Sequence, residues 1–372
     1  MASLPGDRSM KAVVVLDDGR FFEGASWGAL GEAFGEAVFS TGMTGYQETL
    51  TDPSYHRQIV VMTAPHIGNT GMNSTDEESD RIWVSGFIVR DPARTTASHR
   101  SEESLDDSLI RQGVVGVRDI DTRALTRHLR DRGPMRMGIF SGGASELTKE
   151  EMLKRVRQTP EMLGASLASE VSTLKPYQVG SGSFRVAALD LGIKRNTPRE
   201  FANFDITTTI YPAGSSIPEI FGDQPDAFFV SNGPGDPATA YHAIALVQES
   251  LRRGIPFFGI CFGHQIFARA MGLETYKLRF GHRGLNQPVQ EISTGRISIT
   301  SHNHGFAVKS EDVFETPFGK GRVTHRSLND GVVEGIALDD APAFSVQYHP
   351  EAAAGPHDAL ELFQKFFEML RK

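Results

Sequence analysis

The sequence predicts two domains: a β-rich α+β domain, followed by an α/β domain with a flavodoxin-like, doubly wound parallel sheet. Length is the first reason, since 372 residues exceed the ~100–200 residues of a typical domain. The second is a series of short β-rich runs up to about residue 145. The third is an alternation of apolar runs and helical stretches from residue 184 onward. We therefore assign residues 1–145 and 184–372 to the two domains, and residues 146–183 to a helix and a linker.

The first domain begins with a predicted β-hairpin. In KAVVVLDDGRFFEGASWG, two apolar runs flank Asp17-Asp18-Gly19, and Asp-Gly tolerates the positive φ of a type I′ turn. QIVVMTAP and RIWVSGFIVRD are further β-rich runs. DTRALTRHLRDRG predicts a helix with Asp121 as its N-cap and Gly133 just past its end.

A second helix is predicted between the domains. In ELTKEEMLKRVRQTPEMLG, Thr148 and Glu151 have the spacing of a capping box, and Gly164 is the expected terminator. The next stretch, ASEVSTLKPYQVGSGSFR, is polar and lacks a sustained periodicity. We expect the linker there, over residues 165–184.

The second domain alternates strands with helices. Its predicted elements are, in order, FRVAALDLG, KRNTPREFANF, DITTTIYP, PDAFFVSNG, TAYHAIALVQESLRRG, IPFFGICFG and HQIFARAMG. Short continuous apolar runs followed by helical stretches are typical of a parallel sheet that is covered on both faces.

Composition narrows the functional classes. The net charge is −8 and there is no dense Lys/Arg block, so nucleic acid is not an expected partner. A single cysteine cannot form an internal disulfide, which favours a cytoplasmic protein. The N-terminal residues lack the pattern of a signal peptide, and no apolar run approaches the ~18 residues of a membrane span.

The single cysteine, Cys261, lies in GICFGHQ between a predicted buried strand and a helix. Gly259 and Gly263 flank it in the Gly-x-nucleophile-x-Gly pattern of a nucleophile elbow. Such a turn brings backbones close together and places the thiol at a helix N-terminus, where a thiolate is favoured. The alternative is a small buried hydrophobic residue.

A base and an oxyanion hole are candidates elsewhere in the same domain. His349 and Glu351 are two residues apart in YHPE, so an extended chain projects them to one face; ordinary surface residues are the alternative. The N–H of Phe262 follows the candidate nucleophile. Gly233 and Gly235, in SNGPGDP at a strand end, allow backbone to approach a ligand, although a plain tight turn explains them too.

Taken together, SNGPGDP, GICFGHQ, SHNHGFAV and YHPE resemble the motifs of the triad-type class I glutamine amidotransferases. In the first domain, FSTGMTGYQETLTDPSY and QIVVMTAPHIGNTG resemble the small-subunit family of carbamoyl-phosphate synthetases, as do ALDLGIKRN and RFGHRGLNQPV. The likeness extends over nearly the whole chain. An amidotransferase serving another synthase, such as that for anthranilate, lacks this leading domain, and a redox sensor does not require His349 and Glu351.

The resemblance implies that Cys261 attacks the side-chain amide of L-glutamine to give a glutamyl thioester, with His349 as base and Glu351 orienting the imidazole. It implies an oxyanion hole at the N–H groups of Gly233 and Phe262. Some relatives carry a glutamine-contacting Ser where this chain has Gly42, which offers backbone only. The residues that the resemblance places around glutamine are Gly42, Gly233, Gly235, Phe262, Gln265, Asn303, Gly305 and Phe306.

Cofactors and partners follow from the same resemblance. His302 and His304 alternate on one side, with His282 upstream, but no cysteine accompanies them and we expect no metal in this chain. We recognise no nucleotide-binding loop, so ATP and Mg²⁺ are expected on a large synthetase subunit that forms a heterodimer with this chain. That subunit is expected to make carbamoyl phosphate from bicarbonate, ATP and the delivered ammonia, for arginine and pyrimidine synthesis.

Overall fold

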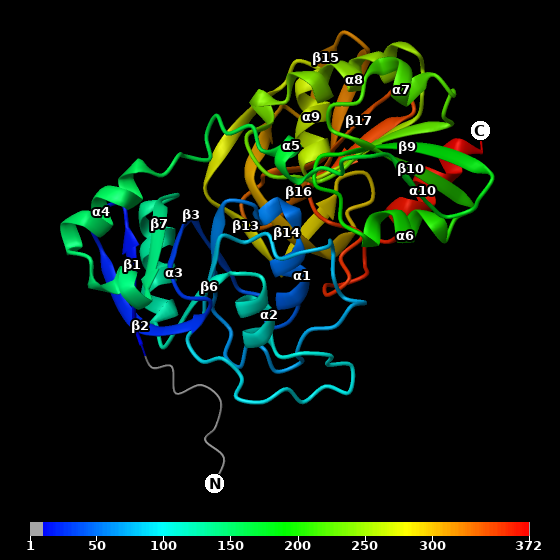
Figure 1. The fold of residues 1–372 in the computed structure, drawn as a ribbon. Coiled ribbons are helices and arrows are strands. Elements are labelled where there is room, and N and C mark those ends of the chain that lie inside the picture. Colours follow the sequence, from blue (N-terminus) through cyan, green and yellow to red (C-terminus); the bar gives the residue numbers. More distant parts are fainter. Residues whose placement is uncertain (1–9, 372) are drawn as a thin grey trace. The chain divides into compact units, whose positions relative to one another are not determined.

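The computed structural model describes residues 10–371 and divides the chain into two compact units, Met1–Met162 and Leu163–Lys372 (Figure 1). Residues 1–9, to which the prediction of no signal peptide partly refers, and residue 372 lie outside the described residues. In the described part of the chain, no helix combines the length and the apolar character needed to cross a membrane.

The first unit is a closed barrel of seven strands in the order β1-β2-β6-β5-β4-β3-β7. The pairs β3–β4, β4–β5 and β5–β6 are parallel, and the other pairs are antiparallel. The strands are β1 (Lys11–Leu16), β2 (Phe21–Gly28), β3 (Glu32–Ser40), β4 (Gln58–Met62), β5 (Gly86–Ile88), β6 (Val115–Arg118) and β7 (Arg136–Ser141). The helices are α1 (Tyr46–Thr51), η1 (Pro53–Tyr55), α2 (Leu105–Arg111), α3 (Thr122–Arg132), η2 (Gly142–Glu146) and α4 (Lys149–Gln158). This confirms a β-rich α+β domain.

The structure confirms the hairpin and the helix caps that the sequence predicted for this unit. β1 and β2 form the predicted hairpin, with Gly19 at φ 91°. The predicted type I′ turn is wrong, because Asp18 does not have the positive φ that such a turn requires next to Gly19. The side chain of Asp121 accepts a hydrogen bond from the N–H of Ala124 and caps α3, which ends before Gly133. The capping box of α4 is also present.

The predicted end of the second helix is wrong. α4 stops at Gln158 instead of continuing to Gly164, because Pro160 disfavours a helical conformation at the residue before it. Met152 and Val156 of α4 pack with Val13 and Phe140 of the barrel, so this helix belongs to the first unit.

The second unit contains one sheet of eleven strands, in the order β15-β16-β13-β14-β17-β18-β12-β11-β9-β10-β8. Five of them, β10-β9-β11-β12-β18, are parallel to one another and follow the 2-1-3-4-5 order of flavodoxin-like folds, which confirms the predicted architecture. The strands are β8 (Tyr177–Val179), β9 (Phe184–Asp190), β10 (Ile206–Pro212), β11 (Ala227–Val230), β12 (Phe257–Ile260), β13 (Glu274–Glu291), β14 (Ile297–Lys309), β15 (Val313–Thr316), β16 (Gly319–Ser327), β17 (Val333–Leu338) and β18 (Ala343–Val346).

Helices cover both faces of the parallel strands. Consecutive phenylalanines face opposite ways: Phe257 packs in the core under α8 and α9, and Phe258 in the core under α6 and α10. The helices of this unit are α5 (Ala168–Val171), α6 (Asn196–Ala202), α7 (Ile217–Phe221), η3 (Pro237–Thr239), α8 (Tyr241–Arg252), α9 (Phe262–Ala270) and α10 (Glu361–Leu370). Both cores are therefore closed by amphipathic helices.

Two features of this unit differ from the predicted pattern. The stretch 165–184, expected to be a linker, contains α5 and the edge strand β8, which pairs antiparallel with β10. The strands β13–β17 extend the sheet with antiparallel pairs, of which β13 with β14 is the longest. This extension places β14 beside the carboxyl ends of the parallel strands, where ligands bind in such folds.

Candidate functional site

Cys261 stands at a sharp turn between β12 and α9. Its φ is 55°, a region that L-residues with side chains rarely adopt. The flanking glycines are required by backbone packing, since a Cβ on Gly259 would lie 2.8 Å from the backbone of Gly263, and one on Gly263 would lie 2.1 Å from the carbonyl oxygen of Val230. The geometry is that of a nucleophile elbow.

The thiol is enclosed but lies next to polar backbone. Cys261 is buried, and its Sγ donates to the carbonyl oxygen of Asn303 at 3.6 Å. Cys261 is also the N-cap of α9, whose first N–H groups have no partner within the helix and favour a negative charge. A residue with only a packing role has no need of a strained φ, so the geometry favours a reactive thiol over a small buried hydrophobic residue.

His349 and Glu351 lie just after β18, the strand next to β12. Both are buried and in contact: His349 Nδ1 is 2.7 Å from Glu351 Oε1. Because an ionised carboxylate only accepts, Nδ1 carries the hydrogen and Nε2 presents a lone pair. Among residues 10–371, Nε2 has no hydrogen-bond partner, which leaves it available as a base. The alternative of ordinary surface residues does not hold for this pair.

Glu351 is kept charged although it is fully buried. Burial by itself raises the pKa of this carboxyl, but Lys194 and His349 outweigh it and hold the pKa at about 2. The Nζ of Lys194 lies 2.9 Å from Glu351 Oε1. Glu351 thus contacts the ammonium group of Lys194 and the imidazole of His349 with the same carboxylate oxygen.

Sequence reasoning missed Lys194 and also Asn196, whose side-chain amide donates to the backbone carbonyl of Glu351. Both follow β9 in LGIKRN, a stretch noted only for its family resemblance. A usable signal was present, since this loop leaves the carboxyl end of a parallel strand, where the functional residues of such sheets gather.

Gly233 and Gly235 lie in the loop after β11, at the same edge of the sheet. A Cβ on Gly233 would lie 2.1 Å from the carbonyl oxygen of Leu191. Gly235 has φ 98°, and a Cβ there would lie 2.6 Å from the carbonyl oxygen of Ala165. Both glycines are therefore needed by the packing of the loop itself.

The remaining candidate residues connect α9 with β14. Gln265 is buried, and its Nε2 donates to the carbonyl oxygen of Phe306 and to Gln347 Oε1, both at 2.9 Å. Phe262 is the first residue of α9. Asn303 and Gly305 occupy alternate positions of β14, so they share a face of that strand. Gly42 lies in the first unit, where its N–H donates to Ser40 Oγ at 3.3 Å.

One group of side chains in the second unit has the composition of a metal centre. His282, His302, His304 and Glu334 are all buried, and one ligand atom from each lies within 4.8 Å of the others. The structure thus brings together the histidines that the sequence placed on one side of a strand, and adds a carboxylate that sequence reasoning missed.

Comparisons of the sequence with known proteins match each unit to a protein family. The model of the family described as "Carbamoyl-phosphate synthase small chain, CPSase domain" matches residues 14–139, and that of "Glutamine amidotransferase class-I" matches residues 187–369. The carbamoyl phosphate synthase small chain of Streptomyces coelicolor is 59% identical, with 99% of this chain and 98% of the relative covered. That of Mycobacterium tuberculosis is 58% identical, with 97% and 98% covered. In structure, a glutamine amidotransferase from Thermotoga maritima matches 46% of this chain and 78% of its own, at 16% identity and a TM-score of 0.36.

Proposed function

Because the chain belongs to the carbamoyl-phosphate synthase small chain family and carries its glutamine-hydrolysing domain, we propose that Cys261, His349 and Glu351 form the catalytic triad of a glutaminase. The observation that carries this proposal is the strained elbow that holds Cys261 at the N-terminus of α9. Its substrate is L-glutamine.

Hydrolysis runs through a glutamyl thioester. His349 Nε2 takes the thiol proton as Sγ of Cys261 attacks the side-chain amide carbon of glutamine. The N–H groups of Gly233 and Phe262 hold the resulting oxyanion. When the C–N bond breaks, the imidazolium returns the proton to the leaving nitrogen and ammonia departs. His349 then activates a water, which attacks the thioester to release glutamate and restore the thiol.

Glu351 and Lys194 act on His349. The carboxylate holds the ring in the tautomer that presents Nε2, and its negative charge stabilises the imidazolium during both proton transfers. Lys194 keeps Glu351 ionised in a buried position and thereby supports that tautomer. Gln265, Asn303, Gly305, Phe306 and Gly235 line the glutamine site.

The partner is a large synthetase subunit, which the naming of the relatives as small chains supports. We place the complex in the cytoplasm, because the single cysteine does not call for an oxidising compartment. This chain delivers ammonia to that subunit, which binds ATP and Mg²⁺ and makes carbamoyl phosphate from bicarbonate for arginine and pyrimidine synthesis. Direct transfer fits the chemistry, because ammonia free in neutral water is mostly protonated and no longer a nucleophile. The first unit serves mainly to dock the large subunit.

The experiment compares glutamate release from glutamine by the purified chain with that of Cys261→Ser and His349→Asn. His242→Asn is a matched control, because this histidine lies on α8, outside the proposed triad, and its Nε2 is hydrogen-bonded to the carbonyl oxygen of Ser215. We expect loss of turnover in the first two variants and normal turnover in the control. Glutamine-dependent turnover that persists in Cys261→Ser would overturn the proposal.

A further inference from the structure

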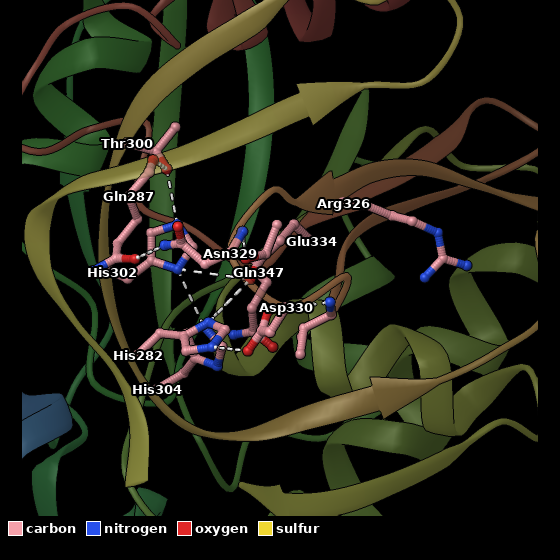
Figure 2. A network of polar contacts seen from close by, with 12 residues as sticks. His282, Gln287, Thr300, His302, His304, Arg326, Asn329, Asp330, Glu334 and Gln347 are labelled. Carbon is pink, nitrogen blue, oxygen red and sulfur yellow. Dashed lines mark hydrogen bonds and ion pairs between the residues drawn. The ribbon is translucent and has the colours of Figure 1, made fainter. Parts of the chain in front are cut away.

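A buried cluster of three histidines and one glutamate lies within the antiparallel extension of the second unit. His282 comes from β13, His302 and His304 from β14, and Glu334 from β17. Figure 2 shows their side chains pointing toward one another from these three strands. The three strands are hydrogen-bonded neighbours, so the cluster joins distant parts of the sequence.

Four of the distances between the inward-facing atoms are close to those between the ligands of a tetrahedral metal ion, and all of the ligand atoms lie within 4.8 Å of one another. His302 Nδ1 is 3.2 Å from His304 Nε2, and His282 Nδ1 is 3.3 Å from Glu334 Oε1. His302 Nδ1 and His304 Nε2 are each 3.7 Å from Glu334 Oε1. Four ligands bound at about 2.0–2.1 Å from a tetrahedral Zn²⁺ are about 3.3–3.4 Å apart.

The outer partners of the rings decide which nitrogens carry hydrogen. His304 Nδ1 lies 2.8 Å from the carbonyl oxygen of Phe306, which can only accept, so Nδ1 is protonated and Nε2 presents a lone pair. The hydroxyl of Thr300 donates to the carbonyl oxygen of Gln287, and therefore accepts from His302 Nε2 at 2.8 Å. His302 Nδ1 is then a lone pair too.

His282 lies between two carboxylates: its Nε2 is 2.8 Å from Asp330 Oδ2, and its Nδ1 is 3.3 Å from Glu334 Oε1. A metal ion bound here would take the place of the hydrogen that Nδ1 can donate to Glu334. The lone pairs of His302 Nδ1 and His304 Nε2 face each other at 3.2 Å, an arrangement that a cation between them stabilises. The other oxygen of the glutamate, Oε2, is buried and has no hydrogen-bond partner among residues 10–371.

We propose that His282 Nδ1, His302 Nδ1, His304 Nε2 and Glu334 Oε1 bind one zinc ion in a closed, structural site. Four protein ligands and no open position are typical of structural zinc, and hydrogen bonds from the second ring nitrogens are typical of zinc-bound histidine. The charges also balance, because Glu334 and Asp330 together neutralise a divalent cation. This proposal differs from the expectation from sequence that these histidines bind no metal.

The site has a structural consequence for glutamine binding. His302 and His304 point to one face of β14, and Asn303 and Gly305 to the other. Zinc therefore fixes the strand that carries two of the proposed glutamine-binding residues and the carbonyl contacted by the thiol of Cys261. This role is separate from catalysis, since none of the four ligands belongs to the triad.

The test is a zinc titration of the full chain, stripped with a chelator and monitored by a competing colorimetric indicator. We expect one tight zinc per chain in the wild type, and loss of that site in His302→Gln and Glu334→Gln. Asp330→Asn should weaken zinc binding about 10–100-fold, because Asp330 is hydrogen-bonded to the second ring nitrogen of the ligand His282. His325→Gln is the matched control, because His325 is also buried in this sheet but lies outside the cluster.

Cobalt substitution keeps the test decisive if a variant fails to fold. Co²⁺ bound to the stripped wild type should show the strong visible absorption bands of tetrahedral coordination. Cys261→Ser should lose glutaminase activity, but it should give the same cobalt spectrum and bind zinc as tightly as the wild type. A wild type that binds no tight zinc, or one whose zinc is lost in Cys261→Ser, would overturn the proposal. The proposed glutaminase does not depend on this result.

Discussion

Replacing Lys194 by methionine should measure how much the buried ion pair of Lys194 and Glu351 contributes to the free energy of unfolding. Methionine fills a similar volume but removes the cation that lies 2.9 Å from Glu351. The pKa of Glu351 is about 2, against an ordinary 4.5, because Lys194 and His349 overcome the effect of burial. At about 1.4 kcal/mol per pKa unit, this shift corresponds to roughly 3 kcal/mol of stability.

The pH dependence of this contribution has a definite sign. Because the folded-state pKa of Glu351 lies below its ordinary value, the stabilisation is complete above pH 4.5 and disappears as the pH falls toward about 2. In Lys194→Met, the pKa of Glu351 should rise, because only His349 then opposes the effect of burial. The variant should be less stable than the wild type by about 3–5 kcal/mol at neutral pH, the cost of leaving a buried charge without its partner, with a gap that narrows in acid.

Urea unfolding followed by circular dichroism measures this difference at several pH values. Tryptophan fluorescence does not serve, since Trp27 and Trp83 both lie in the first unit. Lys309→Met is the matched control, because the pair of Lys309 and Glu274 is exposed and such pairs contribute at most about 1 kcal/mol. Equal losses in the two variants at neutral pH would refute the reasoning.

Three further variants test packing and helix capping. Gly263→Ala should destabilise the second unit by about 1–3 kcal/mol or more, because the new Cβ meets backbone. Gly143→Ala is its control, because a Cβ there meets open space and should cost little. Equal melting temperatures of the two variants would contradict this prediction. Phe201→Ala, fully buried among four aromatic rings, should cost about 3–5 kcal/mol in urea unfolding, and a cost under about 1 kcal/mol would refute that packing. Thr148→Ala removes the cap of α4 and should cost about 1 kcal/mol, whereas no loss on thermal unfolding would show that the capping box contributes little.

The sequence carried enough local signal to predict the parallel part of the fold. Apolar runs such as FFGI and AFFV are short, continuous and bounded by turns, which is the pattern of strands buried on both faces. The elbow could also be predicted, because Gly259 and Gly263 at fixed offsets from Cys261 have a steric reason that the structure confirms. Both patterns, the apolar runs and the flanking glycines, involve residues that are close together in the sequence, so they can be recognised without the structure.

Features set by contacts between distant segments could not be predicted in this way. Strand β8 has only three residues, of which Tyr177 and Gln178 are exposed and Val179 packs against the core, so it is too short to carry a hydrophobic pattern, and its place depends on its pairing with β10. Lys194 gains its role from Glu351, which lies far along the chain. Glu334 joins the histidine cluster only because β17 pairs with β14.

The proposed mechanism requires Cys261 as the nucleophile, and the most direct measurement is to trap its acyl intermediate. The full chain is mixed with labelled L-glutamine, quenched in acid and digested, and the peptide containing Cys261 is examined by mass spectrometry. We predict a glutamyl adduct on this cysteine that is absent in Cys261→Ser. Turnover of glutamine by the wild type with no adduct on Cys261, or with an adduct on another residue, would contradict the central claim.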